Sequence, residues 1–274
     1  MSSGLGCPGP YAGAAETWHR DAMSVYGPLA RHLLAVRPGG RPIEVAGRRV
    51  LDAGAGSGVV GDLLRTAGAE VISVDLEPDM VAALAAKGPA VLADVRDLPF
   101  PADDVAVAAA AFVLNHLPEP EAGLAELGRV TSPDGWVVAS VFGNDRPAAK
   151  SAIDAVATRF GFASPDWYVD LQRAAAGIGT VDGLRGAALR AGLRSVLVDE
   201  QPVDVGLHDP ADVVRYRLAM PHLRPFVQDL EPASRTELCA AATAAVAEVG
   251  MPFRPTVIRL AAQPSRPATT SRSR

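Results

Sequence analysis

Three glycines at alternate positions, Gly54, Gly56 and Gly58, follow a short apolar run that ends in Asp52. Glycine adopts left-handed backbone conformations without strain, and it lets a ligand approach the chain where a Cβ would collide. The first turn of a helix behind such a loop offers free backbone N–H groups. The segment therefore predicts a strand, a tight turn and a helix start that bind a small ligand where they meet.

Two classes of cofactor compete for this turn. Residues 56–61 match the G-x-G-x-x-G pattern of dinucleotide-binding folds, and Asp75 follows at the distance which that pattern expects. However, the strand ends before Gly54, so the first glycine after it opens G-x-G-x-G, with Val59 in place of the third dinucleotide glycine. The carboxylate of Asp52 is unfavourable beside a pyrophosphate, but it attracts an ammonium or a sulfonium. These features favour a cationic cofactor.

The elements that must position this turn alternate along the first half of the chain. Short apolar runs are separated by segments with apolar residues at three- and four-residue spacing. Such alternation predicts a parallel sheet covered by helices on both faces. The expected strands are 49–51, 70–74, 90–92, 105–111 and 136–142, and the expected helices are 59–67, 78–87 and 119–130.

After Gly143 the pattern changes, because several helical segments are inserted between the last strands. The expected helices are 151–160, 164–176, 180–191, 210–220 and 233–249, and the expected strands are 193–199 and 256–261. We expect one domain over residues 11–262, with flexible tails at 1–10 and 263–274. Its helical additions are an N-terminal lid at 11–40 and cap insertions at 144–180 and 208–250.

The composition of the 274 residues excludes several classes of partner. A net charge of −5 gives the whole chain no attraction to nucleic acid. No apolar stretch is long enough for a membrane helix, and the first ten residues lack the order of a secretory signal, so we expect a cytoplasmic protein. Of the 26 basic residues only Lys87 and Lys150 are lysine, a bias typical of GC-rich genomes such as those of actinobacteria.

Several segments between residues 50 and 136 resemble motifs of the class I S-adenosylmethionine (SAM)-dependent methyltransferases. They are Val50–Gly58 for the first motif, Val74–Met80 for the second, Ala93–Phe100 for the third, Phe112–Leu117 after the fourth strand, and Glu126–Val130 with Pro133–Trp136 before the fifth strand. The resemblance implies a Rossmann-like α/β fold. Its doubly wound sheet has seven strands, the last of them antiparallel, and carries helical cap insertions.

The resemblance also assigns residues to the cofactor SAM. It implies that Asp75 accepts both ribose hydroxyls, that Asp94 and Val95 flank the adenine, and that Asp52 offsets positive charge at the methionine end. The implied cofactor residues are Asp52, Gly54, Gly56, Gly58, Asp75, Leu76, Met80, Asp94, Val95 and Phe112. We expect no metal, because no acid follows the fourth strand as in the metal-dependent members.

The acceptor is expected to be a small, largely apolar molecule. The segment after the fourth strand, 112–117, lacks the Asn/Asp-Pro-Pro-aromatic turn of exocyclic-amine methyltransferases and holds no cysteine for cytosine C5 chemistry. Apolar and aromatic residues are available to line a pocket: Tyr11, Trp18, Tyr26, Phe142, Trp167, Tyr168, Tyr216, Met220 and Phe226. Our first hypothesis is methyl transfer to O, N or C of a secondary-metabolite intermediate.

His116 and Tyr11 are the catalytic candidates. The motif position of His116 places it beside the cofactor, where an imidazole serves either as a general base or as a packing residue at a helix start. His19, His208 and His222 are assigned surface or packing roles.

A second class of function stays open. A SAM-binding enzyme of the same fold that catalyses pericyclic closure, or that consumes the side chain of SAM itself, would keep Asp52 and Asp75 but need no base. The sequence does not indicate the oligomeric state.

Overall fold

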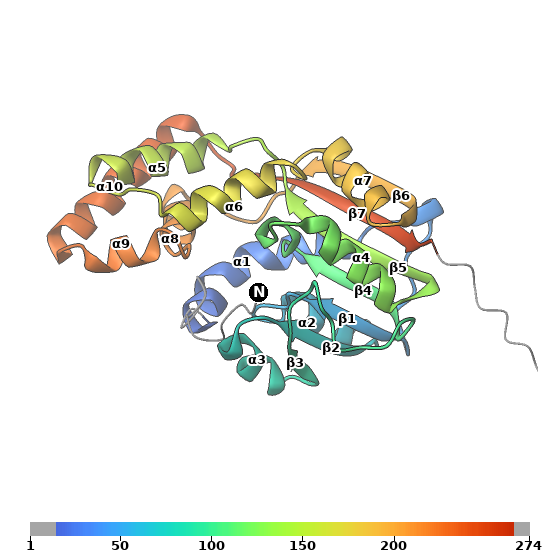
Figure 1. The fold of residues 1–274 in the computed structure, drawn as a ribbon. Helices are drawn as coiled ribbons and strands as arrows, with labels where there is room; N and C mark the ends of the chain where they lie inside the picture. Colours follow the sequence, from blue (N-terminus) through green and yellow to red (C-terminus); the bar gives the residue numbers. More distant parts are fainter. Residues whose placement is uncertain (1–14, 266–274) are drawn as a thin grey trace, which may run out of the picture.

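A computed structural model describes the backbone of residues 15–265 and the side chains of residues 25–265. Seven strands form one sheet in the order β3-β2-β1-β4-β5-β7-β6 (Figure 1). The strands are β1 (Arg49–Ala53), β2 (Glu70–Asp75), β3 (Ala90–Leu92), β4 (Val105–Ala111), β5 (Thr131–Phe142), β6 (Leu193–Pro202) and β7 (Thr256–Pro264). Strands β1 to β5 pair in parallel, and β7 runs antiparallel to both β5 and β6. The expected fold class is confirmed.

Ten α-helices and two short 3-10 helices are found in the described residues. The helices beside the sheet are α1 (Ala15–Leu34), α2 (Val59–Thr66), α3 (Pro78–Ala85), α4 (Pro120–Val130) and α7 (Val181–Arg190), with the 3-10 helices η1 (Pro38–Gly40) and η2 (Leu114–His116). The others are α5 (Ala148–Arg159), α6 (Asp166–Ala176), α8 (Pro210–Leu218), α9 (Arg224–Asp229) and α10 (Pro232–Val249). No described helix is long and apolar enough to cross a membrane.

The two faces of the sheet build two apolar layers, because successive strand residues point to opposite sides. On one face Leu51 of β1 lies in a cluster with buried leucines of α4 and α7. On the other face Val50 lies with Leu33 of α1 and Leu64 of α2. The helices on both faces hold the carboxyl ends of the strands in a fixed arrangement, where a ligand can bind.

A third apolar cluster belongs to the helices of the second half of the chain. Residues of α5, α8 and α10, among them Ile153, Val213 and Leu238, pack with Val25 and Leu29 of α1. In Figure 1 these helices, with α6 and α9, form a separate group beside one end of the sheet. We call α5, α6 and α8–α10 the helical cap.

The structure differs from the sequence expectation at β7, β5 and α9. Strand β7 runs to Pro264, so Gln263 and Pro264, expected in the flexible tail, pair with β6 instead. Strand β5 begins at Thr131 and not at Trp136, because a register shift against β4 between Val105 and Val107 accommodates the Pro-Asp-Gly segment within the strand. Helix α9 was not expected at all, because six residues that include a proline are too few to show a helical period.

Candidate functional site

The glycine-rich loop between β1 and α2 has positive φ at each glycine: 66° at Gly54, 54° at Gly56 and 84° at Gly58. A Cβ at Gly54 would collide with the side chain of Val113, and a Cβ at Gly58 would lie 2.8 Å from Cδ2 of Leu84. Packing against the protein itself therefore requires two of the three glycines.

Asp75, the last residue of β2, holds this loop through hydrogen bonds to its backbone. The N–H of Gly56 donates to its Oδ2 at 2.7 Å, and the N–H of Glu77 donates to its Oδ1 at 2.9 Å. The side chain is only 9% exposed, and burial raises its pKa. The N–H of Leu76 also acts on this carboxylate. Of the roughly four acceptor sites of a carboxylate, about one is therefore left for a hydroxyl of a vicinal diol in the cavity.

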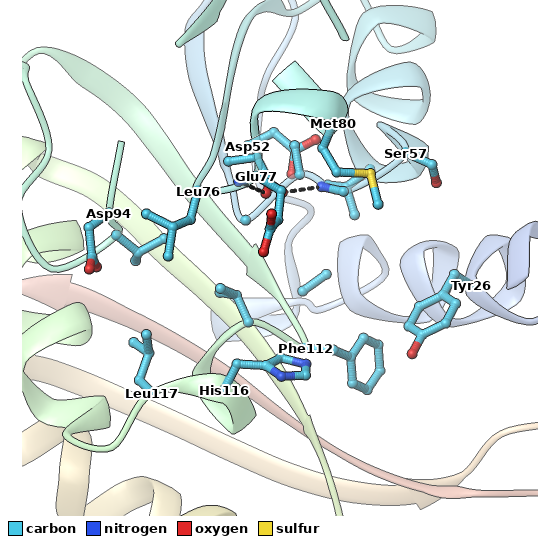
Figure 2. Close-up of a pocket in the computed structure, with 18 of the residues that line it drawn as sticks. Tyr26, Asp52, Ser57, Leu76, Glu77, Met80, Asp94, Phe112, His116 and Leu117 are labelled. Atoms are coloured by element: carbon cyan, nitrogen blue, oxygen red, sulfur yellow. Dashed lines mark hydrogen bonds between the residues drawn. The ribbon is translucent and has the colours of Figure 1, made fainter. Parts of the chain in front are cut away.

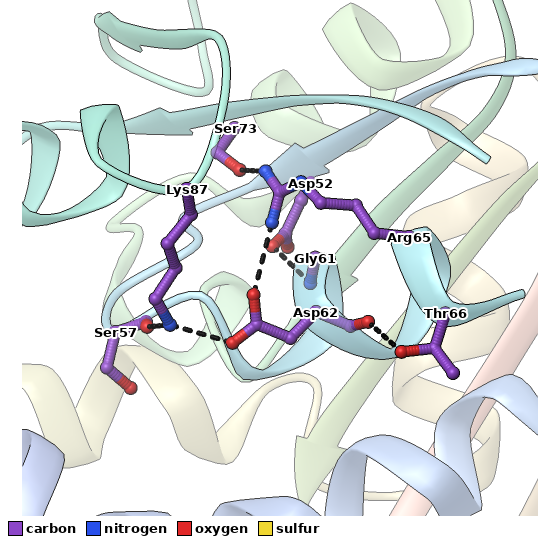
Figure 3. A network of polar contacts seen from close by, with 8 residues as sticks. All are labelled: Asp52, Ser57, Gly61, Asp62, Arg65, Thr66, Ser73 and Lys87. Atoms are coloured by element: carbon purple, nitrogen blue, oxygen red, sulfur yellow. Dashed lines mark hydrogen bonds and ion pairs between the residues drawn. The ribbon is translucent and has the colours of Figure 1, made fainter. Parts of the chain in front are cut away.

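A polar network lies behind the loop and connects it to α2, α3 and β2 (Figure 3). The ammonium of Lys87 donates to the carbonyl oxygen of Ser57 at 2.9 Å and to Asp62 at 2.7 Å. Arg65 also pairs with Asp62, at 3.2 Å, and donates to the hydroxyl of Ser73. These bonds between protein groups keep the loop in one conformation before any ligand binds.

Asp52 is the acid that the sequence places beside the loop, and it is 1% exposed. Its Oδ2 accepts a hydrogen bond from the N–H of Gly61 at 2.8 Å (Figure 3). Burial raises the pKa of Asp52 to about 7, although the Gly61 N–H and nearby Arg65 act in the opposite direction. Its charge at neutral pH therefore depends on what lies near it, and a bound cation would favour the ionised form.

A cavity of about 300 Å³ opens in front of the loop, and we call it the cofactor cavity. Its wall contains all the implied cofactor residues except Gly58. Figure 2 shows Leu76, Glu77 and Met80 on one side of it, with Phe112, His116 and Tyr26 on the opposite side. Gly58 lies outside this wall and acts at the start of α2.

Two of the residues assigned to the adenine lie side by side in this wall. Asp94 is held by Arg96, whose Nη2 donates to Oδ2 at 2.6 Å, and this partner lowers the pKa of Asp94. Val95 is buried next to it. An adenine amine that donates to Asp94 would therefore bind a carboxylate that already accepts hydrogen bonds from Arg96.

A second cavity of about 570 Å³ lies between the strand ends and the helical cap, and we call it the acceptor cavity. Five residues line both cavities: Tyr26, Phe112, His116, Trp167 and Leu171. The two cavities therefore adjoin at these five residues, which we call the shared wall. Ligands in the two cavities would approach each other there, so a group could pass from one to the other. Both volumes suit small molecules.

Phe112 stands in this shared wall with an unusual backbone. Its φ is 58°, a left-handed conformation that bulky residues rarely adopt. The ring lies 4.3 Å from that of Phe142 and 5.7 Å from that of Tyr26, between centroids. Packing on both sides holds the ring in place, and such strain is typical of functional sites.

His116 ends η2, directly after β4, where the motif position puts it. Its surface is open to both cavities, yet the surrounding protein disfavours the imidazolium and lowers its pKa to about 4. Water in the open cavities solvates the ring in part, so we expect the lowering to be fullest when ligands fill both cavities. The imidazole is neutral at pH 7 and can accept a proton, but it is a weaker base than an ordinary histidine.

The other candidates divide clearly. Tyr11 lies outside the described residues, as do the side chains of Trp18 and His19. The expected lining residues Tyr26, Phe142, Trp167, Tyr168, Tyr216 and Met220 are found in the acceptor cavity. Phe226 is not; it packs on Phe162 with ring centroids 5.4 Å apart. His208 is exposed near Asp204.

Sequence reasoning did not place several polar residues in the acceptor cavity, among them Lys150, Arg217 and His222. His222 is 5% exposed and stacks on Tyr168 at 3.6 Å, a packing role as expected, but in the wall of the cavity. Lys150 and Arg217 lie in helices where a single cation gives no signal in the sequence. Only the packing of α5 against α8 and α10 turns them inward.

Comparisons with known proteins concern mainly the cofactor side. Residues 51–139 match the family model described as a methyltransferase domain. The chain is 38% identical over 110 residues to malonyl-[acyl-carrier protein] O-methyltransferase of Halorhodospira halophila, covering 37% of each protein. It is also 38% identical over 104 residues to demethylmenaquinone methyltransferase of Clavibacter sepedonicus, covering 36% of this chain and 42% of the relative. The match thus spans about two fifths of these relatives.

Among solved structures, the fold is similar to a chain of the complex between the Haloferax volcanii Trm112 methyltransferase activator and a methyltransferase. The TM-score is 0.58 at 18% identity, covering 94% of this chain and 96% of that one. This likeness concerns the fold alone. The matched family segment contains the glycine-rich loop, Asp75, Phe112 and His116, but none of the helical cap.

Proposed function

We propose that this chain, which carries a class I SAM-dependent methyltransferase domain, transfers the methyl group of SAM to a small, largely apolar acceptor bound under the helical cap. SAM is the cofactor. The observation that supports the proposal most is the wall that the cofactor and acceptor cavities share. Our first hypothesis for the acceptor remains a secondary-metabolite intermediate, methylated on O, N or C.

The residues of the cofactor cavity fit SAM. Asp75 lines the cavity and keeps acceptor capacity for a hydroxyl of a vicinal diol. Leu76 is 61% exposed, so it offers an apolar surface that an adenine would cover. The buried Asp52 would offset positive charge. When bound, SAM supplies a methyl group on a sulfonium, which a nucleophile takes by in-line displacement.

The chain itself then has three tasks. The polar network and Asp75 hold the loop, so that little ordering remains to be done on binding. Phe112 and Tyr26 define where the two ligands meet and keep water away, which suits a reaction that depends on position. His116 can accept the proton of a hydroxyl acceptor at this wall, and with an amine or carbon acceptor it would serve only as a contact.

The relatives do not identify the acceptor of this chain, because their names refer to different substrates. Incubation with methyl-labelled SAM and an acceptor panel tests the proposal. The panel contains a malonyl-acyl-carrier protein, a demethylmenaquinone and apolar phenols and acids. We expect the label in one of these acceptors. A chain that binds SAM but leaves every acceptor unlabelled would instead support the SAM-binding enzyme that does not methylate.

A further inference from the structure

The acceptor cavity contains a half-buried ammonium that the proposed function does not use. Nζ of Lys150, on α5, lies 4.7 Å from the ring centroid of Phe142 and 5.7 Å from that of Phe253. No carboxylate within residues 25–265 forms an ion pair with it. Burial lowers its pKa to about 8, so the group is still mainly charged at pH 7.

The neighbouring arginine is different, because its charge is already balanced. Arg217, on α8, binds Asp154 through two hydrogen bonds of 3.0 and 2.7 Å. Arg146 and Asp145, both exposed residues of the cavity lining, add one charge of each sign, and Asp145 also acts on Lys150. The lining with Asp154 therefore carries one excess positive charge, and Lys150 is a half-buried cation that has ring contacts but no ion pair within the described residues. An anionic ligand would balance this charge.

Two unsatisfied polar atoms lie in the same cavity wall. Nε2 of His222 and Oδ1 of Asn115 are buried and have no hydrogen-bond partner among the described residues. His222 is close enough to Lys150 and Arg217 for their charges to lower its pKa further, after burial. Its imidazole is therefore neutral, and a neutral imidazole carries one N–H that can donate to a ligand.

We propose that the acceptor carries a carboxylate which binds Lys150, with His222 as a second, neutral donor. This inference rests on the proposed function and names the class of its acceptor. A monoanion is favoured over a phosphate dianion, because a single excess positive charge is available. The remainder of the acceptor lies along Phe142, Trp167 and Met220, so that its nucleophile reaches the shared wall at His116.

The test uses two probes of similar shape, the anion naphthalene-2-carboxylate and the neutral naphthalene-2-carboxamide. Each is titrated calorimetrically into the full chain saturated with S-adenosylhomocysteine. Wild type should bind the carboxylate about tenfold more tightly than the amide. Lys150→Met should abolish this preference and leave the amide affinity unchanged, while Lys150→Arg should restore most of it. His222→Phe, which retains the stack on Tyr168, should weaken both probes and leave the preference for the carboxylate, because a neutral N–H donates to either carbonyl group.

Arg190→Met is the matched control, since Arg190 is an exposed cation paired with Glu121 outside both cavities. It removes the same charge and should change nothing. Equal binding of both probes by wild type, or binding of neither, would overturn the carboxylate site. The titrations are repeated without S-adenosylhomocysteine, so that the preference between the probes is measured even if this product does not bind. Failure to bind S-adenosylhomocysteine would count against the proposed function, whereas loss of the probe preference alone would count against the carboxylate site.

Discussion

The cofactor cavity and the acceptor cavity differ in how their polar groups are satisfied. In the first, the carboxylates of Asp52, Asp75 and Asp94 accept hydrogen bonds from backbone N–H groups or from Arg96. In the second, Lys150 has no carboxylate partner within the described residues, and Nε2 of His222 has no hydrogen-bond partner there. A satisfied site is organised before its ligand arrives, whereas an unsatisfied one gains its partners from the ligand. We infer that the first determines the chemistry and the second the choice of acceptor.

The largest effect is expected in the glycine-rich loop. Gly56→Val should abolish SAM binding, a loss of more than about a hundredfold, because φ is 54° and the loop N–H must stay on Asp75. Gly192→Val is the control, since Gly192 also has a positive φ, 77°, but faces open space. Both variants should lose stability in thermal unfolding, and only Gly56→Val should lose SAM in calorimetry. Equal SAM affinity in the two variants would contradict the role of the loop.

The next effect concerns Asp75. Asp75→Ala should weaken SAM binding by roughly ten- to a hundredfold, the value of a lost hydrogen bond between a charged group and a ribose hydroxyl. It should also lower thermal stability, because the N–H groups of Gly56 and Glu77 lose their acceptor. Asp75→Asn, which keeps one acceptor oxygen, should fall between. Calorimetric titration with SAM measures the affinity of wild type and both variants. Unchanged affinity in Asp75→Ala would remove the ribose assignment.

A substitution at His116 tests the role of the wall that the two cavities share. His116→Ala should lower kcat by about ten- to a hundredfold for a hydroxyl acceptor, with SAM affinity unchanged. When ligands fill both cavities and exclude water, burial lowers the pKa of His116 toward about 4. The basic form is then present throughout pH 6–8, and kcat should not rise there on its account. The pH profile of kcat measures this. A rise near the ordinary histidine pKa would show that the imidazole is more solvated than its surroundings indicate, and a normal kcat in the variant would leave it a packing role.

The smallest effect concerns Asp52. Its raised pKa of about 7 means that the buried acid is mainly protonated at pH 6 and mainly ionised at pH 8. If its charge attracts SAM, affinity should rise with pH, by up to about tenfold over this range. Gly61 N–H, Arg65, Asp62 and Asp75 surround it. Asp52→Asn should give a flat profile in calorimetry, and an unchanged slope in that variant would assign the pH dependence to another group.

The sequence could predict the cofactor cavity because its requirements are local. A glycine is needed where Gly54 meets Val113, and an acid is needed at the end of β2, so both leave a recognisable spacing. The acceptor cavity depends instead on how helices of the cap pack together. Lys150 resembles any lysine on a helix until α5 lies against α8 and α10, and the φ of 58° at Phe112 leaves no trace in residue type.

The most direct test of the account is calorimetric titration of the wild-type full chain with SAM and, separately, with NADH and NADPH. The glycine spacing alone permits both classes of cofactor, whereas the geometry of Asp52, Asp75 and the loop favours SAM. We predict one SAM site with a dissociation constant in the micromolar range and no detectable binding of either nicotinamide cofactor. Tight binding of NADH or NADPH, with none of SAM, would contradict the account.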